Sequence, residues 1–126
     1  MSDLLIGNKK LKNIQLAMTK EEQKKGLMGV EWPPPILVFV YKTPTVAKFW
    51  MKKTPSPLDI IFCRNNRIAD IFQGKPNDEE TFGPDDEIDF VIEAPLGFVA
   101  EHNIRIGGKV RVIYSIEDLK RFLAND

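Results

Sequence analysis

The residues best suited to chemistry lie in one short stretch, residues 49–61, which reads FWMKKTPSPLDII. The stretch supplies an aromatic ring at Trp50, an amine at Lys52 and a carboxylate at Asp59, with two prolines before the carboxylate. Proline fixes a backbone dihedral, so these groups are positioned at low entropic cost. Such groups suit a binding pocket. They also suit a structural lock in which Lys52 or Thr54 satisfies a half-buried Asp59.

A second carboxylate, Glu93, lies in another apolar stretch, and it could stand near Asp59. Paired carboxylates can carry out acid–base chemistry if their surroundings drive their pKa values apart. The pair therefore indicates a hydrolase or lyase as an alternative to a non-enzymatic binding module. We expect the ligand-binding residues to be Trp50, Lys52, Thr54, Asp59 and Glu93.

Other catalytic arrangements find little support. The chain has one histidine, His102, and one cysteine, Cys63, which argues against a histidine-based zinc site and excludes an intramolecular disulfide. The two could form a nucleophile–base pair, but Cys63 continues an apolar strand-like run, where a small core residue is common. No glycine-rich phosphate loop is present. We expect no catalytic residue, no metal site and no cofactor.

Most of the chain has the pattern of β-strands. Apolar runs or apolar–polar alternation predict the following strands: residues 11–17, 36–41, 48–51, 59–63, 67–72, 87–93 and 109–114. Asn65-Asn66 between two of them is typical of a tight hairpin. A capping box at Thr19–Glu22 predicts a helix of barely two turns. Ser115 begins a second helix, within 115–124, with Ile116, Leu119, Phe122 and Leu123 as its apolar stripe. We expect this stripe to be docked.

Length and composition favour one domain spanning residues 1–126. The chain has 126 residues, and apolar residues make up 43% of it. These values are ordinary for a globular domain with its own core. Together with the strand pattern, they predict a mainly β fold with two short helices (α+β). The expected architecture is a compact, twisted antiparallel sheet or a partly open barrel.

Charge and hydropathy limit the partners. The 18 basic and 18 acidic residues cancel, which argues against nucleic acid as a partner. The longest strongly apolar run, residues 36–41, is too short to cross a membrane, and the N-terminus does not resemble a secretory signal. We therefore expect a cytoplasmic monomer, encoded by a host cell or a phage, that binds an unidentified small molecule or protein.

The stretch from Phe49 onward resembles the signature of a family of small bacterial, archaeal and phage proteins, the domain of unknown function 192 family. That signature is F-W-M-K-x-T-x-x-P-L-D-I-x-F, and residues 49–62 match it at each fixed position. The family's A-x-T-x-E-E-x-x-x-G-L-M and V-L-E-x-x-x-G segments are similar to residues 17–28 and 91–97. The resemblance covers about residues 12–113 and leaves the C-terminal helix as an extension.

The resemblance implies a compact, largely β fold and assigns no reaction. Three hypotheses therefore remain open: a binding or accessory module with a rigid polar cleft, the carboxylate enzyme described above, and a structural or assembly protein, for example one of a phage. We expect Asp59 to be coupled to Lys52–Thr54 structurally, with a cleft beside this pair lined by Trp50 and Glu93.

Overall fold

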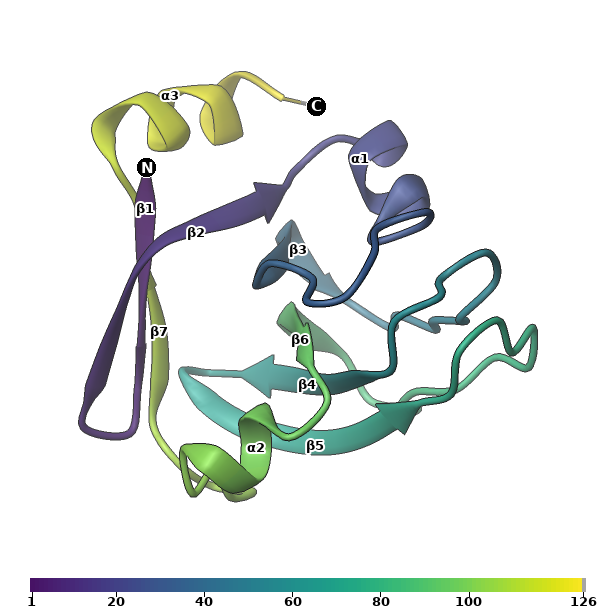
Figure 1. Cartoon of the computed structure of the whole chain (residues 1–126). Coiled ribbons are helices and arrows are strands. Elements are labelled where there is room, and N and C mark those ends of the chain that lie inside the picture. The colour runs from purple at the N-terminus through teal and green to yellow at the C-terminus, as the bar shows by residue number, and fades with distance from the viewer. Residues whose placement is uncertain (126) are drawn as a thin grey trace.

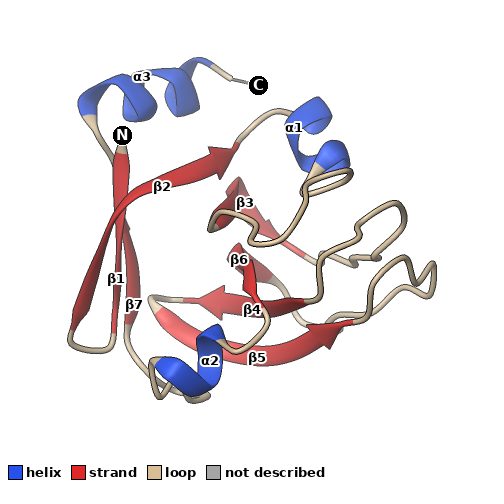
Figure 2. Cartoon of the chain, viewed as in Figure 1, coloured by secondary structure: helices blue, strands red, loops and turns tan. Residues whose placement is uncertain are grey.

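Seven strands form one curled sheet in the computed structural model, which describes residues 1–125 (Figure 1). The strands are β1 (Ser2–Ile6), β2 (Lys9–Ala17), β3 (Leu37–Thr45), β4 (Leu58–Arg64), β5 (Arg67–Gly74), β6 (Ile88–Pro95) and β7 (Val110–Ile113). The helices are α1 (Lys20–Lys25), α2 (Phe98–Glu101) and α3 (Ile116–Ala124). Figure 2 shows how strongly strands dominate the fold, and the predicted mainly β class is confirmed.

The sheet curls until its two edge strands approach each other. The strand order is β5-β4-β6-β3-β2-β1-β7, so β5 and β7 are the edges. A backbone bridge pairs Arg67 of β5 with Lys109, which directly precedes β7. The Val110 N–H also donates to the Asn66 carbonyl at 3.0 Å. The fold is therefore a partly open barrel, as predicted. One pairing departs from the antiparallel expectation, because β2 and β3 run parallel.

Two apolar cores lie on the two faces of the sheet. The first receives side chains from all seven strands and fills the inside of the curl; examples are Leu4, Ile61 and Val110. The second lies on the opposite face of β3, β4 and β6 and includes Phe39 and Phe62. It is covered by α1 with its following turn and by the loops that flank β4. This second layer holds the candidate site.

Local sequence signals account for several of these elements. Thr19 accepts from the Glu22 N–H and the Glu22 carboxylate accepts from the Thr19 N–H, which forms the predicted capping box of α1. At the predicted hairpin, Asn65 and Asn66 have φ values of 52° and 58°, as a type I′ turn requires. The additional helix, α2, has one turn and lacks a side-chain cap of its own, so no local start signal predicts it.

Two expected elements differ in the structure. Residues 48–51 are not a strand, since only Phe49 pairs there, in an isolated bridge with Phe82. The expected docked stripe of α3 is also wrong for three of its four residues: Ile116, Leu119 and Leu123 are exposed. Polar contacts hold the helix instead; its Arg121 guanidinium, for example, pairs with Glu22 of α1.

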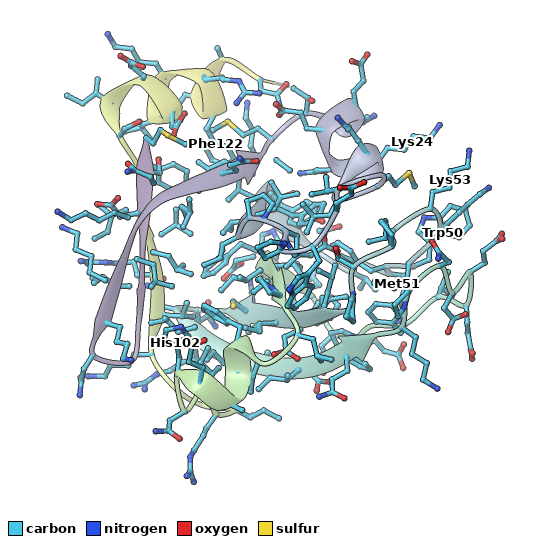
Figure 3. All side chains as sticks on the ribbon, in the orientation of Figure 1. Lys24, Trp50, Met51, Lys53, His102 and Phe122 are labelled. Carbon is cyan, nitrogen blue, oxygen red and sulfur yellow. The ribbon has the colours of Figure 1, made fainter. Side chains whose placement is uncertain are left out.

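One aromatic contact attaches α3 to the sheet. Phe122 stacks on Tyr114 with 5.6 Å between ring centroids, and Figure 3 shows Phe122 beneath the helix. Together with the polar contacts, this ring anchors the helix to the first core.

Candidate functional site

The stretch from Phe49 to Pro57 is an irregular loop, here called the Phe49 loop, that hydrogen bonds hold on both sides. On one side, the Gly29 N–H donates to the Lys53 carbonyl at 2.8 Å, and the Ser56 hydroxyl donates to the Val30 carbonyl at 3.1 Å. On the other, the Met51 N–H donates to the Asp78 carbonyl at 2.8 Å. The loop therefore has a fixed path between the turn after α1 and the loop after β5.

This path separates the side chains of the motif. Met51 is buried in the second core, whereas Trp50 is 41% exposed. The Lys52 ammonium lies over the Trp50 ring, 5.0 Å from its centroid. Thr54 is buried, and its hydroxyl donates to the Lys52 carbonyl at 3.1 Å. Figure 3 shows Trp50 near the molecular surface and Met51 nearer the sheet.

Asp59 is buried at the start of β4, but its partners are not those expected. Its Oδ2 accepts hydrogen bonds from the backbone N–H groups of Gly97, at 3.0 Å, and Val99, at 2.9 Å. These groups lie at the N-terminus of α2, so Asp59 caps a helix that lacks a cap of its own. The expected coupling of Asp59 to Lys52 or Thr54 is therefore wrong, and the lock joins β4 to α2.

Glu93 is buried in the middle of the sheet without a protein partner. It is 4% exposed, and its neighbours across the strands, Leu37 on β3 and Ile60 on β4, are both apolar. Within residues 1–125, its carboxyl forms no hydrogen bond or ion pair. Burial raises the pKa of Glu93 to about 8, so the carboxyl is mostly protonated at neutral pH.

The two buried carboxylates face opposite sides of the sheet. In the antiparallel pairing of β4 and β6, Asp59 is opposite Ala94 and Ile60 is opposite Glu93. Residues directly opposite share a face, and successive residues alternate faces. Asp59 therefore points toward the first core and Glu93 toward the second. The hypothesis of a hydrolase or lyase with these two as a carboxylate pair is wrong, because the sheet separates them.

Glu93 lies in a pocket of about 230 Å³, here called the Glu93 pocket. Its lining comes from α1 and the turn that follows it, from β3 and from the Phe49 loop, and consists of Gln23, Lys24, Lys25, Gly26, Leu27, Met28, Phe39, Tyr41, Lys48, Phe49, Trp50, Thr54 and Glu93. Of the predicted site residues, the structure thus brings together Trp50, Thr54 and Glu93. Lys52 and Asp59 do not line the pocket.

Gly26 lies directly against the Glu93 carboxyl. A Cβ at Gly26 would lie 3.5 Å from Glu93 Oε1 and 3.4 Å from the edge of the Phe39 ring. The residue has a φ of 49°, which favours glycine. Sequence reasoning used Gly26 only as a helix stop and therefore missed its place in the pocket. It also missed Tyr41, whose pKa is raised to about 12 by burial and by the nearby Glu93 carboxylate.

The remaining chemical candidates are poorly placed. Cys63 is fully buried, and burial raises the pKa of its thiol, which disfavours the reactive thiolate. His102 ends α2 beside Phe98, 4.5 Å between ring centroids. In the described part of the chain, residues 1–125, no three His, Cys, Asp or Glu side chains gather as metal ligands would. In the same residues, no helix has the length and apolar character needed to cross a membrane.

The chain is a mostly β domain with a curled sheet, and one face of that sheet carries a buried carboxyl in a pocket. Comparison with known proteins identifies its family. The chain belongs to the domain of unknown function 192 family (DUF192), described as "Uncharacterized ACR", whose model matches residues 4–112. The expected resemblance is thereby confirmed. Helix α3 lies beyond the matched residues. No curated protein matches the chain.

Two solved structures share the fold. A protein of unknown function from Novosphingobium aromaticivorans is 30% identical, with a TM-score of 0.79 over 86% of this chain and 83% of that one. A Sinorhizobium meliloti protein, described as a "putative transcription regulator", is 20% identical, with a TM-score of 0.78 over 89% of this chain and 94% of that one. At that identity, the second likeness concerns the fold alone.

Proposed function

We propose that this chain is a small-molecule binding module whose site is the Glu93 pocket. The observation that carries the proposal is the carboxyl of Glu93, which is 4% exposed and has no protein partner within residues 1–125. The carboxyl opens from a buried strand into the pocket, so a molecule bound there can hydrogen-bond to it. A carboxyl surrounded by apolar side chains is unfavourable, and a ligand hydrogen bond offsets that cost.

The rest of the lining suits a ligand with an aromatic or apolar body. Phe39, Phe49 and Trp50 contribute aromatic rings, and Leu27 and Met28 contribute apolar surface. Ligand sites typically combine such walls with a few fixed polar groups. The pocket is on a rigid support, because Glu93 is in the middle of the sheet and the Phe49 loop is hydrogen-bonded on both sides.

Binding without catalysis is the simpler interpretation of this pocket, because it needs no paired acid and base groups. A hydrolase or lyase needs acid and base groups placed together around the substrate. Glu93 is the only carboxylate in the pocket lining, and the other groups there that titrate are lysines and Tyr41. The alternative role in assembly stays a prediction, as do the monomeric state and the cytoplasmic location.

The two tryptophans allow a direct test by nuclear magnetic resonance. Trp50 lines the pocket, whereas Trp32 is exposed elsewhere and serves as an internal control. The probes are 4-methoxybenzoate, 4-methoxybenzamide and 4-methoxybenzylamine, which share a body and differ in charge. We expect at least one probe to shift the Trp50 indole N–H and the Gly26 backbone N–H while the Trp32 indole signal stays in place.

Matched variants locate the binding. Glu93→Leu should abolish the probe-induced shifts, whereas Asp59→Asn, which changes the buried carboxylate on the other face, should keep them. Amide spectra of both variants verify that they are folded. If no probe moves the Trp50 and Gly26 signals at millimolar concentration, or if Glu93→Leu responds as the unmodified protein does, the proposed function is wrong.

A further inference from the structure

The charged groups of the Glu93 pocket are unevenly distributed between its floor and its mouth. The titratable side chains in the lining are Lys24, Lys25, Lys48, Tyr41 and Glu93. The exposed Lys24 and Lys25 come from the last turn of α1, and Figure 3 shows Lys24 extending outward from this helix. Glu93, by contrast, is on the buried strand β6. The bases are therefore outermost and the single acid innermost.

The charge of one of these lysines is already balanced. The Lys48 ammonium donates to the carbonyls of Gly83 and Pro84, and it forms a 2.7 Å ion pair with Asp85. Lys24 and Lys25, in contrast, take part in no salt bridge within residues 1–125. Because Glu93 is mostly protonated at neutral pH, the pocket carries a net positive charge contributed by these two lysines. A positive pocket attracts anions and repels cations.

We propose, on the basis of the function proposed above, that the ligand is a small organic anion with a planar apolar body. Its acidic group pairs with Lys24 and Lys25 at the mouth, and its body packs between the rings of Phe49 and Trp50. Its inner end carries an oxygen that accepts a hydrogen bond from the protonated carboxyl of Glu93. This arrangement satisfies the buried acid and the unpaired lysines together.

The proposal makes anion binding depend on pH in a stated direction. Ionised Glu93 cannot donate a hydrogen bond, and its negative charge repels an anionic ligand. Binding therefore requires the protonated form, which is lost as pH rises through about 8. The apparent dissociation constant scales inversely with the competent fraction, so it should rise about tenfold by pH 9. Lys24, Lys25, Lys48 and Tyr41 are the other titratable groups that line the pocket with Glu93.

The test compares the three methoxybenzene probes by calorimetry or by titrating the Trp50 indole signal. At pH 6.5 we expect 4-methoxybenzoate to bind at least tenfold more tightly than 4-methoxybenzylamine, with the amide between them. At pH 9 the unmodified protein should bind the benzoate about tenfold more weakly. Glu93→Gln stays uncharged and keeps a donor, so its affinity should be nearly the same at both pH values.

Lysine variants test the mouth of the pocket. The double variant Lys24→Gln, Lys25→Gln should weaken benzoate binding several-fold, whereas Lys20→Gln, on the first turn of the same helix and outside the pocket lining, should leave it unchanged. Tighter binding of the amine or the amide than of the benzoate would overturn the anion proposal and leave the binding function standing. The same pH dependence in Glu93→Gln would also overturn it. Failure of all three probes to bind would instead contradict the binding function itself.

Discussion

The carboxylate of Asp59 and the backbone N–H of Gly97 form a 3.0 Å hydrogen bond across 38 residues of chain. The bond supplies the one-turn helix α2 with a cap from a neighbouring strand. Gly97, at the N-cap, has a φ of 102°, which favours glycine. The family motifs P-L-D and E-x-x-x-G are therefore in contact in this chain through their Asp and their Gly. Asp59 contributes to the fold on the face opposite the pocket.

Replacing Asp59 should reveal this capping role. Asp59→Ala leaves the N–H groups of Gly97 and Val99 without their acceptor, and we expect a loss of about 1–3 kcal/mol in the free energy of unfolding. Lys52→Ala should change stability by about 0.5 kcal/mol or less, because its ammonium lies over the partly exposed Trp50 ring and forms no salt bridge within residues 1–125. Denaturant melts of both variants measure these values.

The double variant then distinguishes the two possible partners of Asp59. We expect the effects of Asp59→Ala and Lys52→Ala to add, since the two side chains share no bond. Amide hydrogen exchange should accelerate at Gly97 and Val99 in Asp59→Ala and not in Lys52→Ala. A coupling of more than about 1 kcal/mol between the two substitutions would contradict the observed hydrogen bonding.

Glu93 should make the protein less stable as pH rises. Burial raises its pKa to about 8 in the folded state from the ordinary value of 4.5, so the folded state holds a proton that the unfolded chain releases. Stability from this group is complete below about pH 4.5 and is lost up to about pH 8. Within that window the expected slope approaches 1.4 kcal/mol per pH unit.

A comparison with Glu93→Gln isolates this contribution. Glutamine does not titrate, so the free energy of unfolding of Glu93→Gln minus that of the unmodified protein should increase steadily between about pH 5 and pH 8. Above pH 8 the difference should level off. A difference that stays constant from pH 5 to pH 8 would mean that Glu93 titrates alike in the folded and unfolded states.

The sequence predicted the strands better than the site, for a physical reason. Alternation, the capping box at Thr19 and the Asn65-Asn66 turn are local signals, and each corresponds to an element of the fold. The face on which a carboxylate stands depends on strand register, which is set by long-range pairing. Proximity in sequence therefore suggested Lys52 as the partner of Asp59, whereas the real partners come from α2.

The apolar stripe of α3 shows that local sequence also leaves the covered side of a helix undetermined. Its periodicity identified an amphipathic helix but not the side that is covered. The sheet ends at β7, so only Phe122 reaches Tyr114, and the rest of the stripe is exposed. The role of Gly26 was equally hidden, since nothing local indicates that the turn after α1 crosses Glu93.

Substitutions in α3 should change stability more at Phe122, which packs on the sheet, than at the exposed Leu123. Phe122→Ala removes the ring that stacks on Tyr114, and we expect a loss of about 1–3 kcal/mol in the free energy of unfolding. Leu123→Ala, on the neighbouring exposed position, should change it by about 0.5 kcal/mol or less. Equal losses at the two positions would indicate that the exposed stripe is covered in solution. Thermal melts of both variants provide the measurement.

The Met51 side chain fills the space that a larger residue at Gly74 would need, so substitutions at the two positions should be coupled. A Cβ at Gly74 would lie 2.4 Å from Met51 Sδ, and Met51 is 1% exposed, so it has little room to move. Gly74→Ala should therefore destabilise the protein by about 1–3 kcal/mol through overpacking. Met51→Ala should cost about 2–5 kcal/mol through the cavity it leaves. Denaturant melts of the double variant should show less than the sum, because the added methyl group has space once Met51 is shortened.

The pairing of β1 with β7 imposes an order on synthesis. Leu4 lies opposite Val112, so one edge of the first strand has no partner until more than a hundred further residues have been made. On a ribosome that adds about 5–20 residues per second, this edge waits for several seconds. Unpaired strand edges invite association with other chains. This edge of the nascent protein therefore stays open to association with other chains until β7 emerges.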